Sequence, residues 1–244
     1  MEQVQLYNGS CYDIIPALKD ASIDLIVTDP PYRLAPHKGT GVYGNNVVCL
    51  DELEKLESVS FEPKKFLDLV KPKMKKFYGY FFCNKFLVKE YLEWADDSKM
   101  KFDIFTLLKS NPLPAWGGHH LNDTEYCIMI RESGAYFDRK LELDDYRKSF
   151  TQKCIKRIHP AEKPVEFLEK FIKVSCPKDG TVLDPFMGSG SIGVAACALG
   201  RRFIGIEKSR DYFCLAEKRI REIDHPSQLC FDFGDGKQPA SSAS

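Results

Sequence analysis

Short hydrophobic runs alternate along the chain with stretches that carry helical spacing of apolar residues. Compact apolar runs rich in β-branched and aromatic residues are typical of buried strands, and spacing of three and four residues is typical of helices. Such alternation predicts an open, mostly parallel α/β sheet with helices on both faces. The expected strands are 23–28, 77–83, 102–108, 125–130, 181–184 and 202–206, and the expected helices are 63–70, 85–94, 164–174, 191–199 and 209–223.

A chain of 244 residues can form one large domain with its own core. We therefore predict a single domain over residues 1–230. The glycine-containing stretch 33–60 interrupts the alternation and is expected to be a mobile loop. The charge-rich stretch 133–158 is expected to be a small insertion. The small, polar residues 234–244 are expected to form a disordered tail.

The composition excludes several classes of protein. Lysine plus arginine and aspartate plus glutamate each number 35, so a polyanion would have to be met by a local patch. The longest apolar run, 77–83, is too short to cross a bilayer, and we expect a cytoplasmic protein without a membrane contact. The nine cysteines are scattered, which indicates reduced, mostly buried thiols. The five histidines lack metal-ligand spacing, so no metal is expected.

A strand, a glycine turn and a helix follow one another in residues 181–193. Gly188 and Gly190 let the backbone approach a ligand, and Gly193 lets the helix pack closely on the strand. Glu207 ends the next strand, where its carboxylate can accept hydrogen bonds from both hydroxyls of a ribose. The segment therefore predicts a pocket for a nucleoside.

These glycines also satisfy the GxGxxG pattern of nicotinamide dehydrogenases, which is the obvious alternative. The turn, however, begins with Asp184-Pro185-Phe186. The chain after Glu207 is also too short for the second half of a dinucleotide fold. A mononucleoside cofactor fits these residues better.

The tetrapeptide Asp29-Pro30-Pro31-Tyr32 ends the buried strand 23–28. Each proline fixes its own φ and restricts the residue before it, so the Asp29 carboxylate and the Pro30 carbonyl are held rigidly. In open α/β sheets ligands bind at this carboxyl end of the strands.

Two rigid acceptors at this place suit the methylation of an exocyclic amine. Asp29 and the Pro30 carbonyl can accept the two protons of the amine, so that its lone pair faces a methyl donor. Transfer then needs mainly positioning, which is worth up to about 7–11 kcal/mol. Tyr32 can stack on a base that has left the duplex.

Six segments follow one another along the chain: Asn8-Gly9-Ser10-Cys11, Asp29-Pro30-Pro31-Tyr32, residues 108–114, residues 159–164, residues 184–190 and Gly205-Ile206-Glu207. In this order they resemble the β class of DNA amino-methyltransferases, and the resemblance runs from about residue 7 to about residue 223. It implies a Rossmann-like methyltransferase sheet with a small DNA-reading insertion, S-adenosylmethionine as cofactor, and transfer to a flipped base.

The resemblance also implies roles for individual residues. Asp29, Pro30, Pro31 and Tyr32 would be catalytic. Lys163 would contact the carboxylate of the cofactor and Glu207 its ribose. The full expected cofactor set is Ser10, Cys11, Asp29, His159, Lys163, Pro164, Asp184, Phe186, Gly188, Ser189, Gly190 and Glu207. The expected DNA set is Tyr32, Arg33, His37, Lys38, Lys109, Asn111, Pro112, Arg139 and Arg157, with 133–158 as the target-recognition segment.

Two positions refine the prediction. The family usually has aspartate where this chain has Ser10, and a neutral hydroxyl is a weaker acceptor, so weaker cofactor binding is expected. Family members with aspartate at the start of the tetrapeptide mostly methylate adenine N6, which Asp29 favours. Three alternatives remain: methylation of cytosine N4, a substrate that is RNA or the glutamine amide of a protein, and a DNA-binding relative with impaired catalysis. Double-stranded DNA is the expected partner, and a homodimer and a cognate restriction nuclease are further hypotheses.

Overall fold

A computed structural model describes residues 3–31, 61–110, 120–121, 123–152, 163 and 165–224. These residues form one eight-stranded sheet in the order β1-β8-β7-β2-β3-β5-β4-β6. Within the described part, β5 runs antiparallel to both neighbours and every other pairing is parallel. The strands are β1 Val4–Asn8, β2 Leu25–Thr28, β3 Tyr78–Cys83, β4 Lys101–Lys109, β5 Thr124–Arg131, β6 Ser149–Gln152, β7 Thr181–Asp184 and β8 Arg202–Glu207.

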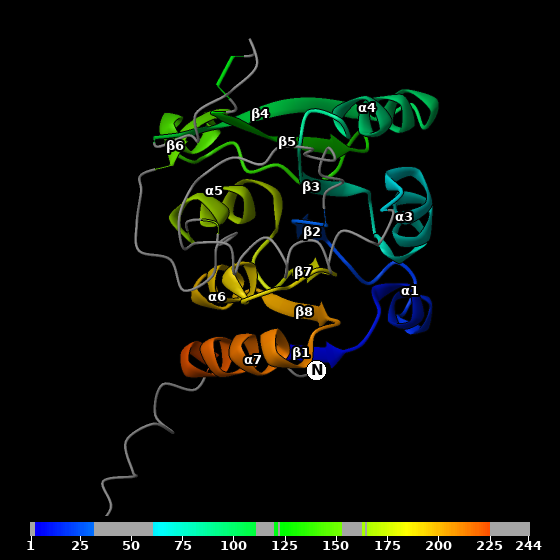
Figure 1. Ribbon diagram of the computed structural model, residues 1–244, viewed down its shortest axis with the longest axis vertical. Coiled ribbons are helices and arrows are strands. Elements are labelled where there is room, and N and C mark those ends of the chain that lie inside the picture. The colour runs from blue at the N-terminus through cyan, green and yellow to red at the C-terminus, as the bar shows by residue number, and fades with distance from the viewer. Residues whose placement is uncertain are drawn as a thin grey trace, which may run out of the picture.

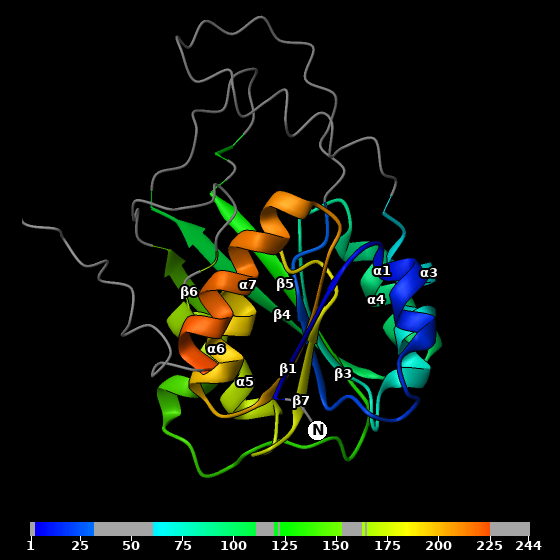
Figure 2. The ribbon, with the colours of Figure 1, turned by 90° about the horizontal axis from the view of Figure 1, so that it is seen from below.

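Helices cover both faces of the sheet, as predicted. Figure 1 and the view turned by 90° in Figure 2 place α5, α6 and α7 on one face and α1, α3 and α4 on the other. Short 3-10 turns η1 Ile15–Ala17, η2 Lys71–Lys73 and η3 Leu143–Tyr146 connect elements. The helices are α1 Cys11–Ile14, α3 Pro63–Val70, α4 Val88–Asp97, α5 Val165–Ser175, α6 Ser191–Ala198 and α7 Arg210–Asp224.

Each face of the sheet has its own hydrophobic core. Under α5, the ring of Phe171 stacks on Tyr80 of β3 with centroids 4.0 Å apart. On the other face, Phe77 packs against Trp94 of α4 with centroids 5.0 Å apart. The strands β2 and β7 are buried along their whole length. This is why they appear in the sequence as continuous apolar runs instead of alternating ones.

The strand order reverses at β2, which pairs with β3 on one side and with β7 on the other. Ligands bind in open α/β sheets at the carboxyl ends of the strands beside such a point. Asp29 follows β2 directly, and β7 and β8 lead into the glycine turn and Glu207. The topology therefore brings the predicted tetrapeptide and the predicted nucleoside turn to one edge of the sheet.

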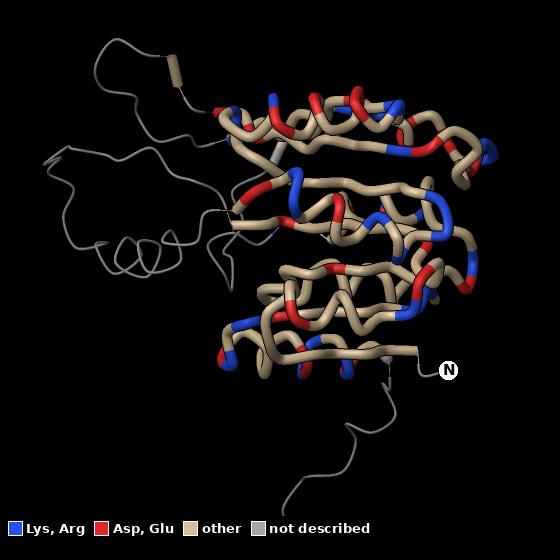
Figure 3. Tube along the Cα trace, turned by 90° about the vertical axis from the view of Figure 1, so that its right-hand side faces the viewer, with Lys and Arg blue, Asp and Glu red and all other residues tan. Residues whose placement is uncertain are grey.

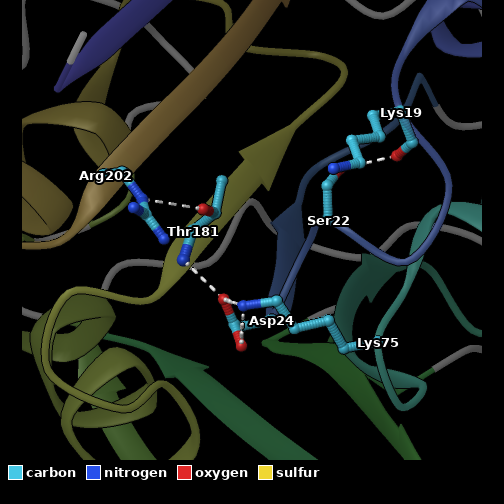
Figure 4. Close-up of polar contacts among 6 residues, drawn as sticks. All are labelled: Lys19, Ser22, Asp24, Lys75, Thr181 and Arg202. Atoms are coloured by element: carbon cyan, nitrogen blue, oxygen red, sulfur yellow. Dashed lines mark hydrogen bonds and ion pairs between the residues drawn. The ribbon is translucent and has the colours of Figure 1, made fainter. Parts of the chain in front are cut away.

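Polar contacts hold the opposite edge together (Figure 4). The Asp24 carboxylate accepts from the backbone N–H of Thr181 at 2.9 Å and from Lys75 Nζ at 2.8 Å. Arg202 Nε donates to Thr181 Oγ1 at 3.2 Å, and Ser22 Oγ donates to the Lys19 carbonyl at 2.6 Å. The bonds of Thr181 to Asp24 and to Arg202 tie the amino ends of β2, β7 and β8 to one another.

Three elements were not predicted. Among the described strands, β1 pairs only with β8 and β6 only with β4, so they need no continuous apolar run and lack the signal of the central strands. The short helix α1 begins at Cys11 with Ser10 as its N-cap. The predicted helix 85–94 begins later, at Val88, and ends at Asp97.

The described cysteines Cys11, Cys83, Cys127, Cys176, Cys197 and Cys214 are free thiols, and all but Cys214 are buried, as predicted for these six. Burial raises the pKa of the Cys83 thiol to about 12. Within the described ranges, no helix is both long enough and apolar enough to span a membrane.

Candidate active site

Asp29 lies at the end of β2 beside a buried ammonium group. Its Oδ2 is 2.8 Å from Nζ of Lys163, whose side chain is only 7% exposed. Pro30 is buried and Pro31 is partly buried, which holds the chain rigidly after the strand. The structure thus brings together two residues that lie more than a hundred positions apart and that the sequence assigned to the same site.

The charged cluster continues from Lys163 to two residues at the same edge. Lys163 Nζ is 3.1 Å from Oε2 of Glu125, and Lys109 Nζ is 2.9 Å from Oε1 of Glu125. Burial alone would lower the pKa of Lys163, but the two carboxylates Asp29 and Glu125 raise it. Burial acts to raise the pKa of Glu125, yet the two lysines lower it to about 2. Lys163 and Glu125 are therefore both charged near neutral pH.

The glycine turn after β7 has two left-handed residues, with φ of +52° at Gly188 and +86° at Gly190. A Cβ on Gly190 would lie 2.9 Å from Cβ of Ala216, so α7 can pack on the turn only because this position is glycine. A Cβ on Gly188 would meet nothing within 4 Å. Gly188 therefore presents its backbone to open space, as a ligand-facing turn requires.

Glu207 ends β8 and holds the turn with its carboxylate. Oε2 accepts from the N–H of Gly188 at 2.8 Å, and Oε1 accepts from the N–H of Ser209 at 2.7 Å. Each carboxylate oxygen has two acceptor positions, so both oxygens can also accept from a pair of ribose hydroxyls. The Glu207 carbonyl accepts from Asn8 Nδ2 at 2.8 Å and from the N–H of Gly9 at 2.9 Å. This brings the 8–11 segment to Glu207.

Thr28 and Asp184 connect the two halves of the site. Thr28 Oγ1 donates to Oδ1 of Asp184 at 2.8 Å, and the same oxygen accepts from the N–H of Phe186 at 3.2 Å. Burial raises the pKa of the Asp184 carboxyl group to about 8. Asp184 is only 1% exposed and its carboxyl group bonds to Thr28 and to the turn, while its predicted contact with the cofactor stays a prediction.

Four further predicted cofactor residues have structural contacts of their own. Ser10 Oγ accepts from the N–H of Tyr12 at 3.3 Å and caps α1, a role that aspartate would also fill. Cys11 is buried, and burial raises its pKa to about 12. Phe186 packs against Phe66 with ring centroids 5.5 Å apart. The Ser189 carbonyl accepts from Arg219 at 2.7 Å.

Nine predicted residues lie outside the described residues, and their roles stay predictions. Four follow Asp29, two follow β4 and three follow β6 or flank Lys163. They are Tyr32, Arg33, His37, Lys38, Asn111, Pro112, Arg157, His159 and Pro164.

The structure does not bring Arg139 to this site, and its predicted contact with DNA stays a prediction. Arg139 lines a cavity of about 410 Å³ together with Tyr78 and Asp103. Tyr78 begins β3 and Asp103 lies near the start of β4, at the edge opposite Asp29. Lys148, in the same stretch, is paired with Asp103. In the view of Figure 3, basic and acidic residues are interspersed along the described trace.

Glu125 and Thr28 were not predicted from the sequence as residues of this site. Thr28 directly precedes the tetrapeptide, and its place in a buried strand hid its hydrogen-bonding role. Glu125 lies near the start of its strand, and the start of a strand reaches this edge only when the strand is antiparallel, as β5 is. A single glutamate at the start of an apolar run was the available signal.

Comparison with known proteins gives one consistent result. Residues 23–218 match the model of the N6/N4 family described as DNA methylase. The type II methyltransferase M2.DpnII of Streptococcus pneumoniae is 31% identical over 239 residues, which cover 88% of each chain.

Two solved structures share the fold. The M1.HpyAVI–SAM complex matches with a TM-score of 0.64 and 24% identity, over 89% of this chain and 99% of that one. The PvuII DNA methyltransferase, described as cytosine-N4-specific, matches with a TM-score of 0.69 and 17% identity, over 92% of each chain.

Proposed function

Because this chain belongs to the N6/N4 DNA methylase family, we propose that it methylates the exocyclic N6 amine of adenine in duplex DNA, with S-adenosylmethionine as the methyl donor. One observation carries the proposal. The residue before Asp29 is hydrogen-bonded to the residue that begins the glycine turn, Thr28 to Asp184 at 2.8 Å. The acceptor for an amine and the turn for a nucleoside are thereby held side by side.

The residues of the turn and the buried lysine fit this cofactor. Gly188 faces open space, Glu207 offers acceptors for ribose hydroxyls, and Lys163 offers a buried ammonium for a carboxylate. An ammonium has three donors, and two carboxylates account for two of those on Lys163 among the described residues. When bound, S-adenosylmethionine supplies an electrophilic methyl group.

Asp29 and Pro30 prepare the amine. The lone pair of an adenine amine is delocalised into the ring, so the free amine is a poor nucleophile. If the Asp29 carboxylate and the Pro30 carbonyl accept its two protons, the nitrogen becomes more tetrahedral and its lone pair points away from both acceptors. Both groups are held by a buried strand end, so little reorganisation accompanies the reaction. Tyr32 would stack on the flipped base.

Asp29 supports adenine as the target base, because aspartate at the start of the tetrapeptide is typical of adenine-specific members. The likeness to the PvuII enzyme, at 17% identity, concerns the fold and leaves cytosine N4 as the alternative target. Tritiated-methyl transfer to mixed-sequence duplex DNA, followed by nucleoside analysis, tests the assignment. We expect the label on N6-methyl-2′-deoxyadenosine. Label on cytosine N4 would overturn adenine as the target base. Stronger labelling of RNA or protein added in competition with the DNA would overturn DNA as the substrate.

A homodimer is proposed as the assembled form. The side chains of Phe102, Ile104 and Leu108 on β4 are 45%, 40% and 42% exposed, a row of apolar groups that supports self-association. We expect sedimentation velocity to show a dimer that Ile104→Glu dissociates. A monomeric wild-type protein would contradict this.

Two further proposals concern the setting of the reaction. The type II naming of the relatives supports site-specific methylation beside a restriction nuclease. An intracellular substrate, DNA, supports a cytoplasmic location.

A further inference from the structure

Lys163 places its charge between two carboxylates, although only one of them belongs to the predicted motifs. Nζ is 2.8 Å from Asp29 and 3.1 Å from Glu125, and it lies 5.0 Å from the centre of the Phe82 ring. A buried ammonium with one carboxylate would bind that carboxylate strongly. Asp29 would then be held by Lys163 and would be a poorer acceptor for a substrate amine.

Glu125 is placed to prevent Lys163 from holding Asp29 too strongly. Its two oxygens bind different lysines, Lys163 at 3.1 Å and Lys109 at 2.9 Å, so the glutamate is itself fixed from the other side. The order Asp29, Lys163, Glu125, Lys109 alternates in charge and has no net charge. Glu125 can therefore hold Lys163 while Asp29 turns to another partner.

The antiparallel direction of β5 brings Glu125 within reach of Lys163. Glu125 is opposite Leu107 of β4, and the next residue, Tyr126, is opposite Cys83 at the end of β3. A parallel strand in this place would bring its last residues to the site. The reversed strand is thus the reason that a residue near its beginning reaches Lys163.

We propose that Glu125 is a positioning residue that anchors the Lys163 ammonium, so that Lys163 can bind the carboxylate of S-adenosylmethionine while Asp29 accepts from the target amine. The inference rests on the proposed function. It assigns no direct contact between Glu125 and either substrate.

A double-mutant cycle tests the proposal by equilibrium binding of S-adenosylmethionine, measured by calorimetry. Glu125→Gln should weaken binding about tenfold in the wild-type background, the effect of one lost charged hydrogen bond. In a Lys163→Met background the same change should weaken it by less than about twofold, because the partner is already absent. The exposed control Glu93→Gln, which removes a pair with Lys89, should change neither. Equal weakening in both backgrounds would overturn the proposal.

A second measurement does not need the cofactor. In an NMR titration of lysine side chains, Glu125→Gln should lower the pKa of Lys163 relative to the wild type. An unchanged titration would overturn the anchoring role. Lys109→Met provides a second variant should Glu125→Gln fold poorly, and it should weaken cofactor binding in the same direction. If wild-type protein bound no S-adenosylmethionine, the proposed function would fail, while the titration would still decide the Glu125–Lys163 contact.

Discussion

Thr28 and Asp184 are bonded through their side chains, Oγ1 to Oδ1 at 2.8 Å, although they lie 156 positions apart in the chain. Thr28 is the last residue of β2 and Asp184 the last residue of β7. The bond therefore joins the ends of the two strands that lead into the tetrapeptide and the glycine turn. A side-chain contact of this kind sets the distance between the two parts of the site more tightly than strand pairing alone.

The first prediction concerns this bond. Thr28→Val keeps the volume of the buried side chain but leaves Asp184 without its hydroxyl donor, at a cost of about 1–3 kcal/mol in the free energy of unfolding. Urea denaturation measures that loss, and methyl transfer should fall with it. Thr28→Ser, which keeps the hydroxyl, should recover most of the transfer activity. A serine variant as inactive as the valine variant would contradict the role of the bond.

The second prediction concerns pH. Burial raises the pKa of Asp184 to about 8 from an ordinary value of 3.8. A raised carboxyl pKa means that the folded protein binds the proton more tightly, so this contribution is fully present below about pH 4 and is lost as pH rises towards about 8.

Asp184→Asn removes that contribution and keeps an acceptor for Thr28. Between about pH 5 and 7, the unfolding free energy of the wild type should fall relative to the variant by up to about 1.4 kcal/mol per pH unit. Glu125, with its pKa at about 2, titrates below this pH range and does not contribute to the slope. Parallel stability curves for the two proteins would show that Asp184 is ionised throughout.

The third prediction separates two glycines. A methyl group on Gly188 enters open space, so Gly188→Ala should lower the free energy of unfolding only by the strain of the left-handed backbone, about 1–2 kcal/mol. The same methyl group should weaken cofactor binding. A methyl on Gly193 would lie 2.4 Å from Ile220 Cδ1 and 2.7 Å from Phe203 Cε1. Gly193→Ala should therefore cost about 1–3 kcal/mol by overpacking and leave affinity per folded molecule unchanged. Thermal unfolding and calorimetric binding distinguish the two, and a reversed pattern would refute the assignment.

The fourth prediction concerns Asp29. Asp29→Ala should lower turnover by about a thousandfold, as expected for a preorganised group that acts in the transition state. Cofactor affinity should stay within about tenfold, because the turn and Glu207 are unaltered. Asp97→Ala, at a side chain that is 70% exposed, is the matched control. Single-turnover methylation is the measurement, and a variant with wild-type turnover would remove Asp29 from the mechanism.

The fifth prediction tests the placement of Arg139 at the opposite edge of the sheet. A phosphate contact contributes about one unit to the slope of log K against log salt concentration. Arg139→Ala should leave that slope unchanged in a DNA-binding titration. A slope reduced by about one would return Arg139 to the DNA interface.

Much of the fold follows from local pattern. The buried runs that became β7 and β8 and the helical spacing of residues 63–70 and 191–198 are dictated by which side chains must leave water. The tetrapeptide and the glycine turn are equally local, since prolines and left-handed glycines restrict the backbone wherever they occur. Their order along the chain was enough to indicate the family and the edge of the sheet at which they meet.

Tertiary structure alone decided the partners across that edge. The contact of Lys163 with Asp29 and Glu125, the bond of Thr28 to Asp184, and the removal of Arg139 to the far edge depend on which strands become neighbours and on the reversed direction of β5. Strand order results from the packing of whole faces, and a local pattern carries no information about it. The sequence by itself determined which groups could do the chemistry, and the sheet determined which of them face one another.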